Sequence, residues 1–460
     1  MGELKQSSFN LLTALFQDEP MASIWSEQGS LSRWLQVEAG LALAQAEVGL
    51  ITSADAELIA AACNPDAIDT DRLWDEARNV GYPILPLIRQ VAATLSAGPD
   101  GRVHYGATTQ DIMDTALAMQ LGDSCDRLEA LLVRLGDAVH VLVERHAATV
   151  MAGRTHAQQA VPTTFGAKMA VFLEEVRQTL QRIRSVGTQV RVVSLFGAAG
   201  TSAATGASSP AVRQVLARRL ELADTVVPWH VARGNVAHFG LTAATAAALC
   251  TRFAREVVDL SRTELGEVRE RDGHHRGASS TMPQKANPIS SESIIGLAVN
   301  AGSSATTLLR AMEAGHERSA GEWQIEWLAL PSVSVLTATA IAVTADLAES
   351  LQVFPEAMLR NLSAESGLIM SEAAMMRLAP MLGRERAHDL VYEAASRGRA
   401  SGENLKVELR ALLTDDLLDK IGWLEPGDYT GEAEDICAAA SLAWSETRNH
   451  NPLVGEDFRD

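Results

Sequence analysis

The sequence predicts an all-α protein built around a long helix bundle. Strand-like alternation of apolar and polar residues is scarce, aromatic residues make up only 5% of the chain, and Ala, Leu, Glu and Arg are abundant. Apolar residues instead recur at steps of three and four over segments of roughly thirty residues, a length typical of bundle helices.

Four long helices are expected in the middle of the chain. In the first, apolar residues at these steps run from Leu117 to Leu142, so that one stripe faces a partner. A second helix should follow Pro162. A third should cover about 236–267, where an Ala-rich stretch permits close helix approach, and a fourth should begin near Pro288.

A chain of 460 residues is long enough for two or three domains with a sizeable core. We expect three helical domains: an N-terminal domain at 1–111, a central long-helix bundle domain at 112–363 and a C-terminal domain at 364–460. The last boundary lies at FPEAMLRNLSAESG, where a proline and a polar cluster interrupt the helical pattern.

Composition and charge exclude several classes of protein. The formal net charge of −19 argues against a nucleic-acid partner, because phosphate binding needs a basic face, although a local pocket could still take a small anion. The N-terminus lacks a basic segment followed by a clean apolar one, and no apolar run approaches the length that spans a bilayer. We therefore expect a cytoplasmic protein without a membrane partner. The cysteines form no CxxC pair and are expected to be reduced thiols: Cys63, Cys125, Cys250 and Cys437.

Three polar segments that contain glycine interrupt the helical pattern: 101-GRVHYGATTQD-111, 152-AGRTHAQQAVP-162 and 277-GASSTMPQKANPISSE-292. Each lies at the end of an expected long helix, and helix ends from distant parts of a chain can converge in a bundle. The segments could also be ordinary interhelical turns, in which Gly, Thr and Ser are common.

The first two segments offer carboxylate binding and proton transfer. Thr108, Thr109 and Gln110 are uncharged donors suited to a carboxylate, particularly if they open a helix whose N-terminal amides also favour an anion. His156 could move a proton near neutral pH.

The third segment could supply a base and a counter-charge. Lys285 and Asn287 could stabilise charge that develops on a substrate carboxylate. A serine is a poor base by itself, but one whose oxyanion is held by loop amides and a nearby lysine could abstract a carbon-bound proton. Together the three segments describe an enzyme that removes a proton next to a carboxylate.

No cofactor and no metal site are expected. His274 and His275 are adjacent and have no carboxylate or cysteine at ligand spacing. The Gly-rich stretch 197-GAAGTSAATG-206 lacks the GKS or GKT ending of a phosphate loop, so a tight turn is expected there. Trp323 and Trp327 are expected in the core or in a pocket wall.

The stretch GASSTMPQKANP resembles the signature loop of the fumarase and aspartase superfamily, and the similarity extends over nearly the whole chain. VHYGATTQDIMDTAL, LFGAAGT and HERSAGEWQIEW are similar to the branch of 3-carboxy-cis,cis-muconate cycloisomerases and adenylosuccinate lyases. The resemblance implies an all-helical homotetramer with a core of about twenty helices. It also implies that three subunits build each active site and that the three polar segments meet only across subunits.

Site residues follow from the same resemblance. Ser279 matches the superfamily's catalytic base, and Ser280 matches its neighbour in the oxyanion-stabilising loop. His156 matches a histidine on the other side of the substrate, and Glu292 matches the glutamate that orients this histidine. Lys285 matches the lysine of the signature loop. The candidate substrate-binding residues are Thr108, Thr109, Gln110, Thr155, Ser280, Asn287 and Arg233.

A histidine and its orienting carboxylate resemble the equipment of an elimination enzyme. The resemblance therefore implies a lyase that cleaves a small substituted succinate at a carbon–nitrogen bond and releases fumarate. The substrate would be a small dicarboxylate, such as an N-substituted aspartate or nitrosuccinate. The alternatives are a 3-carboxy-cis,cis-muconate cycloisomerase, an adenylosuccinate lyase and a non-catalytic structural protein.

Overall fold

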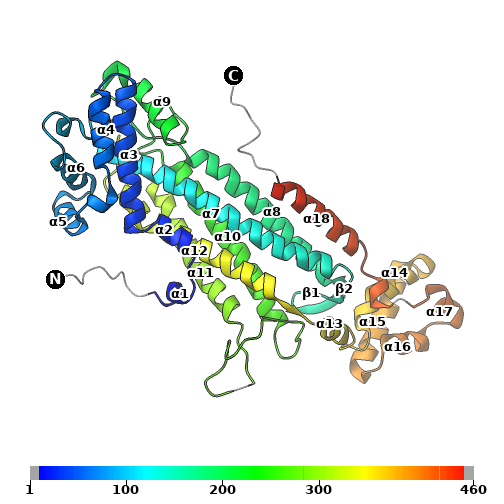
Figure 1. Ribbon diagram of the computed structural model, residues 1–460. Coiled ribbons are helices and arrows are strands. Elements are labelled where there is room, and N and C mark those ends of the chain that lie inside the picture. The colour runs from blue at the N-terminus through cyan, green and yellow to red at the C-terminus, as the bar shows by residue number, and fades with distance from the viewer. Residues whose placement is uncertain (1–9, 283, 424, 450–460) are drawn as a thin grey trace. The chain divides into compact units, whose positions relative to one another are not determined.

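The computed structural model describes residues 10–282, 284–423 and 425–449. Within them it contains 18 α-helices and four short strands, which confirms the all-α class (Figure 1). The helices are α1 (Leu11–Leu15), α2 (Glu19–Ile24), α3 (Glu27–Glu47), α4 (Ser53–Ala62), α5 (Thr70–Val80), α6 (Ile84–Ala93), α7 (Thr109–Arg145), α8 (Phe165–Val190), α9 (Ser209–Arg219), α10 (Gly234–Leu260), α11 (Ile289–Ala311), α12 (Glu322–Ser350), α13 (Pro355–Leu362), α14 (Ser371–Leu382), α15 (Arg384–Ser401), α16 (Leu405–Leu412), α17 (Asp415–Ile421) and α18 (Ala433–Asn449). The strands are β1 (Val150–Thr155), β2 (Gln158–Thr164), β3 (Val268–Arg269) and β4 (Gln352–Val353).

The chain divides into two compact units. The first unit comprises Met1–Leu132, Thr179–Cys250 and Gly296–Ala342, and the second comprises Val133–Gln178, Thr251–Ile295 and Val343–Asp460. The five longest helices, α7, α8, α10, α11 and α12, each supply residues to both units. The expected division into three domains along the chain stays a prediction.

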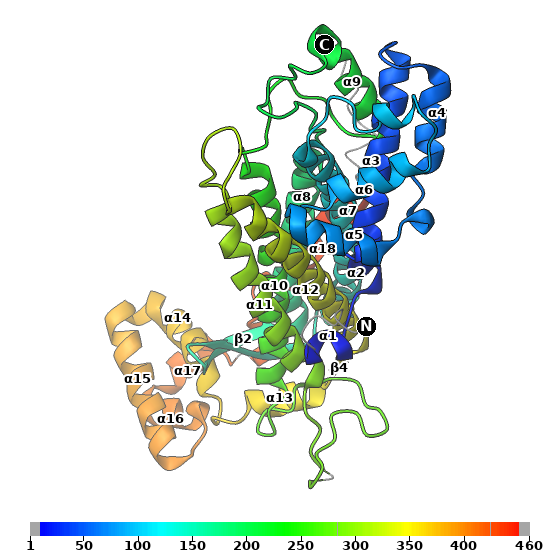
Figure 2. The ribbon, with the colours of Figure 1, turned by 90° about the vertical axis from the view of Figure 1, so that its left-hand side faces the viewer.

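The core of the first unit is built around α3. Ser26 caps this helix by accepting the amide N–H of Gly29 at 2.9 Å, and Glu27 places a negative charge in the first turn, where the helix dipole favours it. The helix packs against α4 and α9, and Gly40 lets the side chain of Leu216 approach closely. Figure 2 shows α3 to α6 gathered at this core.

The second unit has a core of its own in the C-terminal helices. α14 packs against α15, and α15 packs against α16. Ala152 of β1 joins this cluster, so the hairpin strand is part of the same core. Buried aliphatic side chains of these helices belong to it, among them Leu378, Val391, Leu405 and Leu409.

A β-hairpin joins the end of α7 to the start of α8. β1 and β2 pair antiparallel, with Thr155 opposite Gln158 next to the turn. The sequence pattern indicated only a polar break between helices here, so the hairpin is a feature that it missed. The turn residues, His156 and Ala157, are not the Asn-Gly or Asp-Gly pair that signals a two-residue hairpin turn.

The four expected long helices are present, with shifted ends. α7 begins at Thr109, before the apolar stripe that marks it in the sequence. Its first turn is polar, so that turn adds no residue to the stripe. α8 and α11 begin close to Pro162 and Pro288, as expected. α10 ends at Leu260 rather than near 267, because a turn leads from there into β3.

One helix, α12, is long and apolar enough to cross a membrane by length and composition alone. The mean hydropathy of its best 18-residue window is 1.8. The expectation that no apolar run approaches this length was therefore wrong. Because 67% of that window is buried inside the protein, the same residues also fit a buried core helix.

Candidate active site

The Ser279 hydroxyl lies among backbone donors. Its Oγ accepts the amide N–H groups of Thr281 at 3.3 Å and of Met282 at 3.2 Å. Hydrogen bonds donated to an oxygen favour its negatively charged form, so this arrangement favours an alkoxide more than an isolated serine would. The loop thus provides amides of the kind that a serine base requires.

Backbone pairing shapes the loop that carries Ser279. The amide N–H of Asn287 donates to the carbonyl of Gly277 at 2.9 Å, and Ala278 and Ala286 form an isolated bridge. Gly277 has a φ of +64°, and a Cβ at this position would lie 2.5 Å from the carbonyl oxygen of Asn287. Only glycine fits both constraints, so Gly277 fixes where the loop leaves its stem.

Glu270 ties this stem to the start of α11. Its buried carboxylate accepts the amide N–H of Ser290 at 3.1 Å, and the amide and hydroxyl of Ser291 at 2.9 and 2.8 Å. An anion at a helix N-terminus is favourable because the free amides and the dipole both point toward it. Arg276 adds a hydrogen bond from Nη2 to Ser290 Oγ at 2.7 Å. The two ends of the loop are therefore joined within a single chain.

His156 lies at the tip of the β1–β2 hairpin. Its φ is +49°, and its side chain is exposed. Below the tip, Arg154 forms a bidentate ion pair with the buried carboxylate of Glu267, at 2.8 and 2.6 Å. Asn361 donates to the same carboxylate at 2.7 Å. These contacts anchor the base of the hairpin and leave the imidazole free to face another group.

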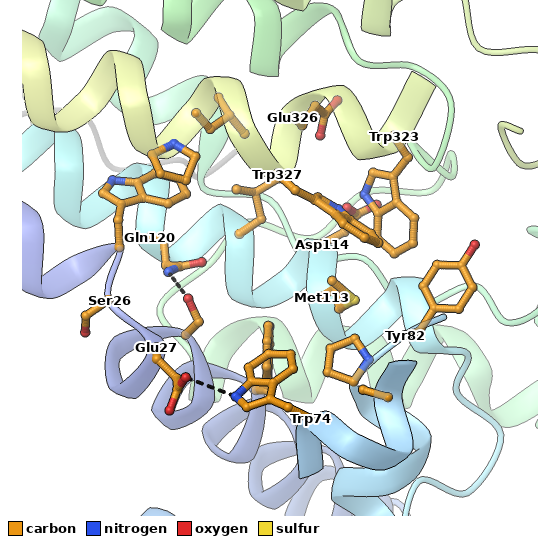
Figure 3. Close-up of a pocket in the computed structure, with 18 of the residues that line it drawn as sticks. Ser26, Glu27, Trp74, Tyr82, Met113, Asp114, Gln120, Trp323, Glu326 and Trp327 are labelled. Atoms are coloured by element: carbon orange, nitrogen blue, oxygen red, sulfur yellow. Dashed lines mark hydrogen bonds between the residues drawn. The ribbon is translucent and has the colours of Figure 1, made fainter. Parts of the chain in front are cut away.

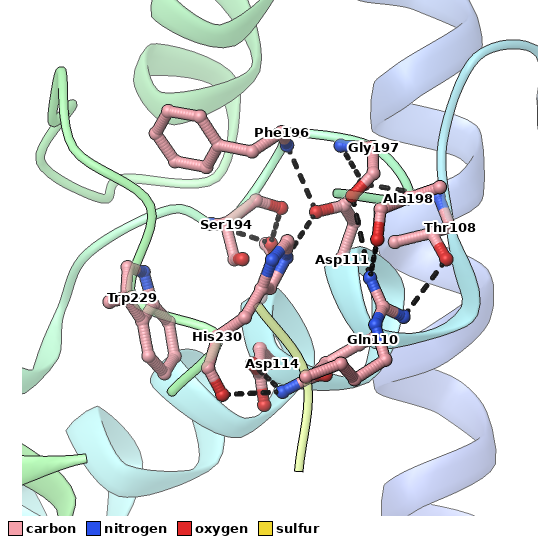
Figure 4. A network of polar contacts seen from close by, with 12 residues as sticks. Thr108, Gln110, Asp111, Asp114, Ser194, Phe196, Gly197, Ala198, Trp229 and His230 are labelled. Atoms are coloured by element: carbon pink, nitrogen blue, oxygen red, sulfur yellow. Dashed lines mark hydrogen bonds and ion pairs between the residues drawn. The ribbon is translucent and has the colours of Figure 1, made fainter. Parts of the chain in front are cut away.

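The start of α7 is organised by Asp111 (Figure 4). Its carboxylate accepts the amide N–H groups of Thr108, Phe196 and Gly197 at 3.0, 2.9 and 2.8 Å, and Nε2 of His230 at 2.8 Å. Because an ionised carboxylate can only accept, Nε2 of His230 carries a proton. Nδ1 of the same ring is buried, and it has no hydrogen-bond partner in the part of the chain that the structure describes. Asp111 thus joins three distant segments of the sequence.

A buried ion triad lies one turn further along α7. Arg233 donates to both oxygens of Asp114, at 2.9 and 3.1 Å, and from Nε to Glu326 at 2.7 Å. Burial raises the pKa of both Asp114 and Glu326, although the guanidinium opposes that shift. Gln110 donates to Asp114 at 3.0 Å and to the backbone carbonyl of His230 at 2.9 Å. Gln110 and Arg233 therefore position α7, and their expected contact with a substrate stays a prediction.

A cavity of about 580 Å³ opens beside this triad in the first unit (Figure 3). Tyr82 stacks on Trp323 with 5.9 Å between the ring centroids, and Trp327 meets Trp323 edge-on at 5.1 Å. Asp114 and Glu326 also line it. We call it the aromatic cavity, after the six aromatic side chains in its wall: Trp25, Trp34, Trp74, Tyr82, Trp323 and Trp327. The expectation that Trp323 and Trp327 lie in the core or in a pocket wall is confirmed.

Comparison with known proteins identifies the family. A family model described as Lyase matches residues 16–302, and one described as Adenylosuccinate lyase C-terminus matches residues 367–440. The chain belongs to the fumarase/aspartase superfamily. As a lyase-superfamily member it is an enzyme, which agrees with the resemblance of its Ser279 loop.

Relatives of this superfamily member carry different activities. The chain is 38% identical to trans-aconitate decarboxylase 1 from Mycosarcoma maydis, over 84% of this chain and 78% of the relative. It is 32% identical to N-acetyl-S-(2-succino)cysteine lyase from Dickeya dadantii, over 92% of this chain and 94% of the relative. The structure of 3-carboxy-cis,cis-muconate lactonizing enzyme from Pseudomonas putida is similar with a TM-score of 0.89 and 34% identity, covering 95% of this chain and 99% of that one. The chain's membership of the superfamily is therefore established, while the reactions of its relatives differ.

The site residues expected for the superfamily are divided between the two units. The first unit contains Thr108, Thr109, Gln110 and Arg233, and the second contains Thr155, His156, Ser279, Ser280, Lys285, Asn287 and Glu292. Among the described residues of the second unit, no hydrogen bond joins His156 to Glu292 or Ser279 to Lys285. Thr155, His156, Ser280, Lys285 and Glu292 are exposed in the single chain, and Asn287 is half-buried. The predicted role of Glu292 in orienting His156 is thus not realised within one chain.

Sequence reasoning missed two residues beside the start of α7. Arg318 donates from Nη1 to the Thr108 hydroxyl at 3.1 Å and from Nη2 to the carbonyl of Ala198 at 2.8 Å. A cation therefore stands next to the segment expected to bind a carboxylate. The motif HERSAGEWQIEW contains Arg318 and could have revealed it. The second residue, His230, lies 119 positions from Asp111, and no spacing signal links the two.

No three His, Cys, Asp or Glu side chains in 10–282, 284–423 and 425–449 are grouped to hold an ion. Within the described part of the chain none of the four cysteines forms a disulfide, and burial raises the pKa of the Cys63 and Cys125 thiols to about 12.

Proposed function

We propose that this protein is a lyase that removes a heteroatom substituent from a substituted succinate by β-elimination and releases fumarate. The observation that carries the proposal is the Ser279 hydroxyl, which accepts two loop amides at 3.3 and 3.2 Å within GASSTMPQKANP. A serine oxygen in that environment suits removal of a proton from a carbon next to a carboxylate.

The bonds would change in the following order. Ser279, as the alkoxide, takes the proton from the carbon next to one carboxylate, and the electron pair of the C–H bond moves into that carboxylate to give an enediolate. The pair then returns to form the carbon–carbon double bond, while the bond from the neighbouring carbon to the heteroatom breaks. The leaving group departs with the pair of that bond and accepts a proton from His156. Lys285 and Asn287 stabilise the charge on the enediolate.

The proposal includes a homotetramer whose subunits share each site. His156, Glu292 and Lys285 are exposed in the single chain, which leaves them available to a neighbouring subunit. Enclosing them between subunits would lower the local dielectric, which strengthens the charge stabilisation that elimination needs.

The leaving group defines the variant of the reaction. We propose carbon–nitrogen cleavage, with an N-substituted aspartate or nitrosuccinate as the type of substrate. The name of the Dickeya dadantii relative refers to a succino group on sulfur, so carbon–sulfur cleavage is the variant to compare with it. The second candidate function is cycloisomerisation of 3-carboxy-cis,cis-muconate, which is favoured by the similarity to the Pseudomonas putida enzyme.

A substrate panel separates these reactions. Purified protein would be incubated with N-substituted aspartates, nitrosuccinate, S-(2-succino) thiols and 3-carboxy-cis,cis-muconate, and fumarate would be measured by chromatography. Fumarate from a substituted succinate supports the lyase. Consumption of the muconate without any fumarate from the other compounds would replace the proposal with the cycloisomerase.

Substitution of Ser279 tests the role of the base. Ser279→Ala should lower turnover by at least ~10²-fold, the lower end of general-base contributions, with little change in substrate binding. Ser303→Ala is the matched control, because Ser303 is an exposed serine whose hydroxyl donates to the Val299 carbonyl within α11. A Ser279→Ala enzyme that exchanges the carbon-bound proton with deuterated solvent at the normal rate would exclude Ser279 as the base.

Replacing His156 should have an effect that depends on the leaving group. If it protonates the leaving group, His156→Ala should slow substrates with poorly departing amines more than nitrosuccinate, whose nitrite leaves easily. Glu292→Gln should weaken the same step. Equal losses for all leaving groups in the two variants would contradict this role.

A further inference from the structure

The aromatic cavity follows the helix face that begins at the carboxylate-binding segment. Between Thr109 and Gly122 of α7, only Thr109, Met113 and Leu117 are partly exposed. Residues four apart lie on one face of a helix, so these three form a single stripe. Met113 and Leu117 line the aromatic cavity. Thr109 continues the stripe by one turn, about 6 Å, toward the helix N-terminus.

The wall of the aromatic cavity suits a flat apolar group. The rings of Tyr82, Trp323 and Trp327 contact one another with centroids between 5.1 and 6.0 Å apart. Such rings attract a further ring by edge-to-face and offset stacking. The volume of about 580 Å³ is also in the range of about 300–1,000 Å³ that is usual for small-molecule sites.

The charges around the aromatic cavity disfavour an anion inside it. Asp114 and Glu326 share the single guanidinium of Arg233, so this side is negative when both carboxylates are ionised. Among the lining residues in the described part of the chain, Arg78 is the one cation. Its side chain is 65% exposed and forms an ion pair with Asp75. A phosphate or a further carboxylate would therefore meet more repulsion than attraction here.

We propose that the aromatic cavity binds the substituent of the substrate and that this substituent carries an aromatic ring. The inference rests on the proposed function, because it places a substrate carboxylate at Thr108 and Thr109 and the departing group beyond it. A ring attached to the succinate through one or two atoms would then lie beside Met113, one helical turn along the stripe. Among the substituted succinates of the proposed function, N-aryl and N-arylalkyl aspartates become the preferred substrate class.

Benzylsuccinate tests the aromatic cavity separately from the reaction. Its ring is attached through carbon, so it cannot be eliminated, and methylsuccinate is the matched ligand without the ring. Titration calorimetry should show benzylsuccinate binding at least about tenfold more tightly, because burial of a phenyl ring is favourable by that factor or more. Trp327→Ala should remove most of the preference and leave the affinity for methylsuccinate within about twofold.

Two further variants serve as controls. Trp327→Phe keeps a ring and should restore part of the preference, and Trp423→Ala, outside the cavity lining, should leave the preference unchanged. Equal affinity for the two ligands, binding of neither, or a preference that survives both Trp327→Ala and Tyr82→Ala would overturn the inference. A ring preference lost in Trp327→Ala, without turnover of any substituted succinate, would instead support the cavity and overturn the proposed elimination.

Discussion

Replacement of Asp111 by asparagine should destabilise the protein far more than the small change in shape suggests. Oδ1 accepts from Phe196 N and His230 Nε2, and Oδ2 accepts from Thr108 N and Gly197 N. Whichever way the amide of the variant turns, its NH₂ group faces two donors, so two hydrogen bonds are lost. Hydrogen bonds to a charged group contribute about 1.5–3 kcal/mol each, which gives an expected loss of about 3–6 kcal/mol in the free energy of unfolding.

Urea denaturation followed by circular dichroism would measure this loss. Asp126→Asn is the matched control on the same helix, because Asp126 is 62% exposed and its ion-pair partner is Arg191. Exposed ion pairs contribute about 0–1 kcal/mol, so the control should hardly change the unfolding midpoint. If the two variants differed by less than about 1 kcal/mol, the view that Asp111 organises the start of α7 would be refuted.

Further expectations concern the Ser279 loop, the contact between Glu38 and His104, and the active sites shared between subunits. Gly277→Ala should lower turnover at unchanged helix content, since the backbone excludes a Cβ there, and normal steady-state kinetics would contradict this. Burial opposes the charged form of His104, but Glu38 outweighs it and the pKa of His104 is raised. This contact should stabilise the fold below the ordinary histidine pKa and lose that effect as the pH rises through the raised value. His104→Asn should flatten that part of a series of urea midpoints against pH, and an unchanged curve would speak against the pair. Chains carrying Ser279→Ala and His156→Ala should each be nearly inactive and should regain activity when refolded together, whereas inactive mixtures with proven subunit exchange would argue for sites within one chain. Exhaustive chelation with EDTA should leave turnover unchanged, and loss restored by one metal would show a cofactor requirement.

The long helices could be predicted because their signal is local. The apolar stripe from Leu117 to Leu142 marks α7 without reference to any other part of the chain. The start of α7 could not be predicted in this way, because its first turn is polar. Asp111 in that turn accepts from Phe196, which lies 85 positions away, and only the folded chain brings the two together.

The position of the Ser279 loop could be predicted, but its geometry could not. Hydroxyls, a lysine and glycine crowd into one segment, and that composition is visible in the sequence. The anchoring role of Glu270 depends on the free amides of Ser290 and Ser291, which become donors to it only when α11 forms. Nothing in the sequence around Glu270 indicates that its carboxylate anchors the loop.

The backbone at the hairpin tip limits how far this enzyme could be stabilised without harm. His156 and Ala157 have φ values of +49° and +63°, and a left-handed conformation costs an L-residue about 1–2 kcal/mol. Asn-Gly would fit the same two-residue turn with little strain. A search for heat-resistant variants should therefore recover replacements of His156 that make the protein more stable. If the imidazole acts as proposed, those variants would also be poor enzymes, so thermal stability and activity favour opposite residues at one turn.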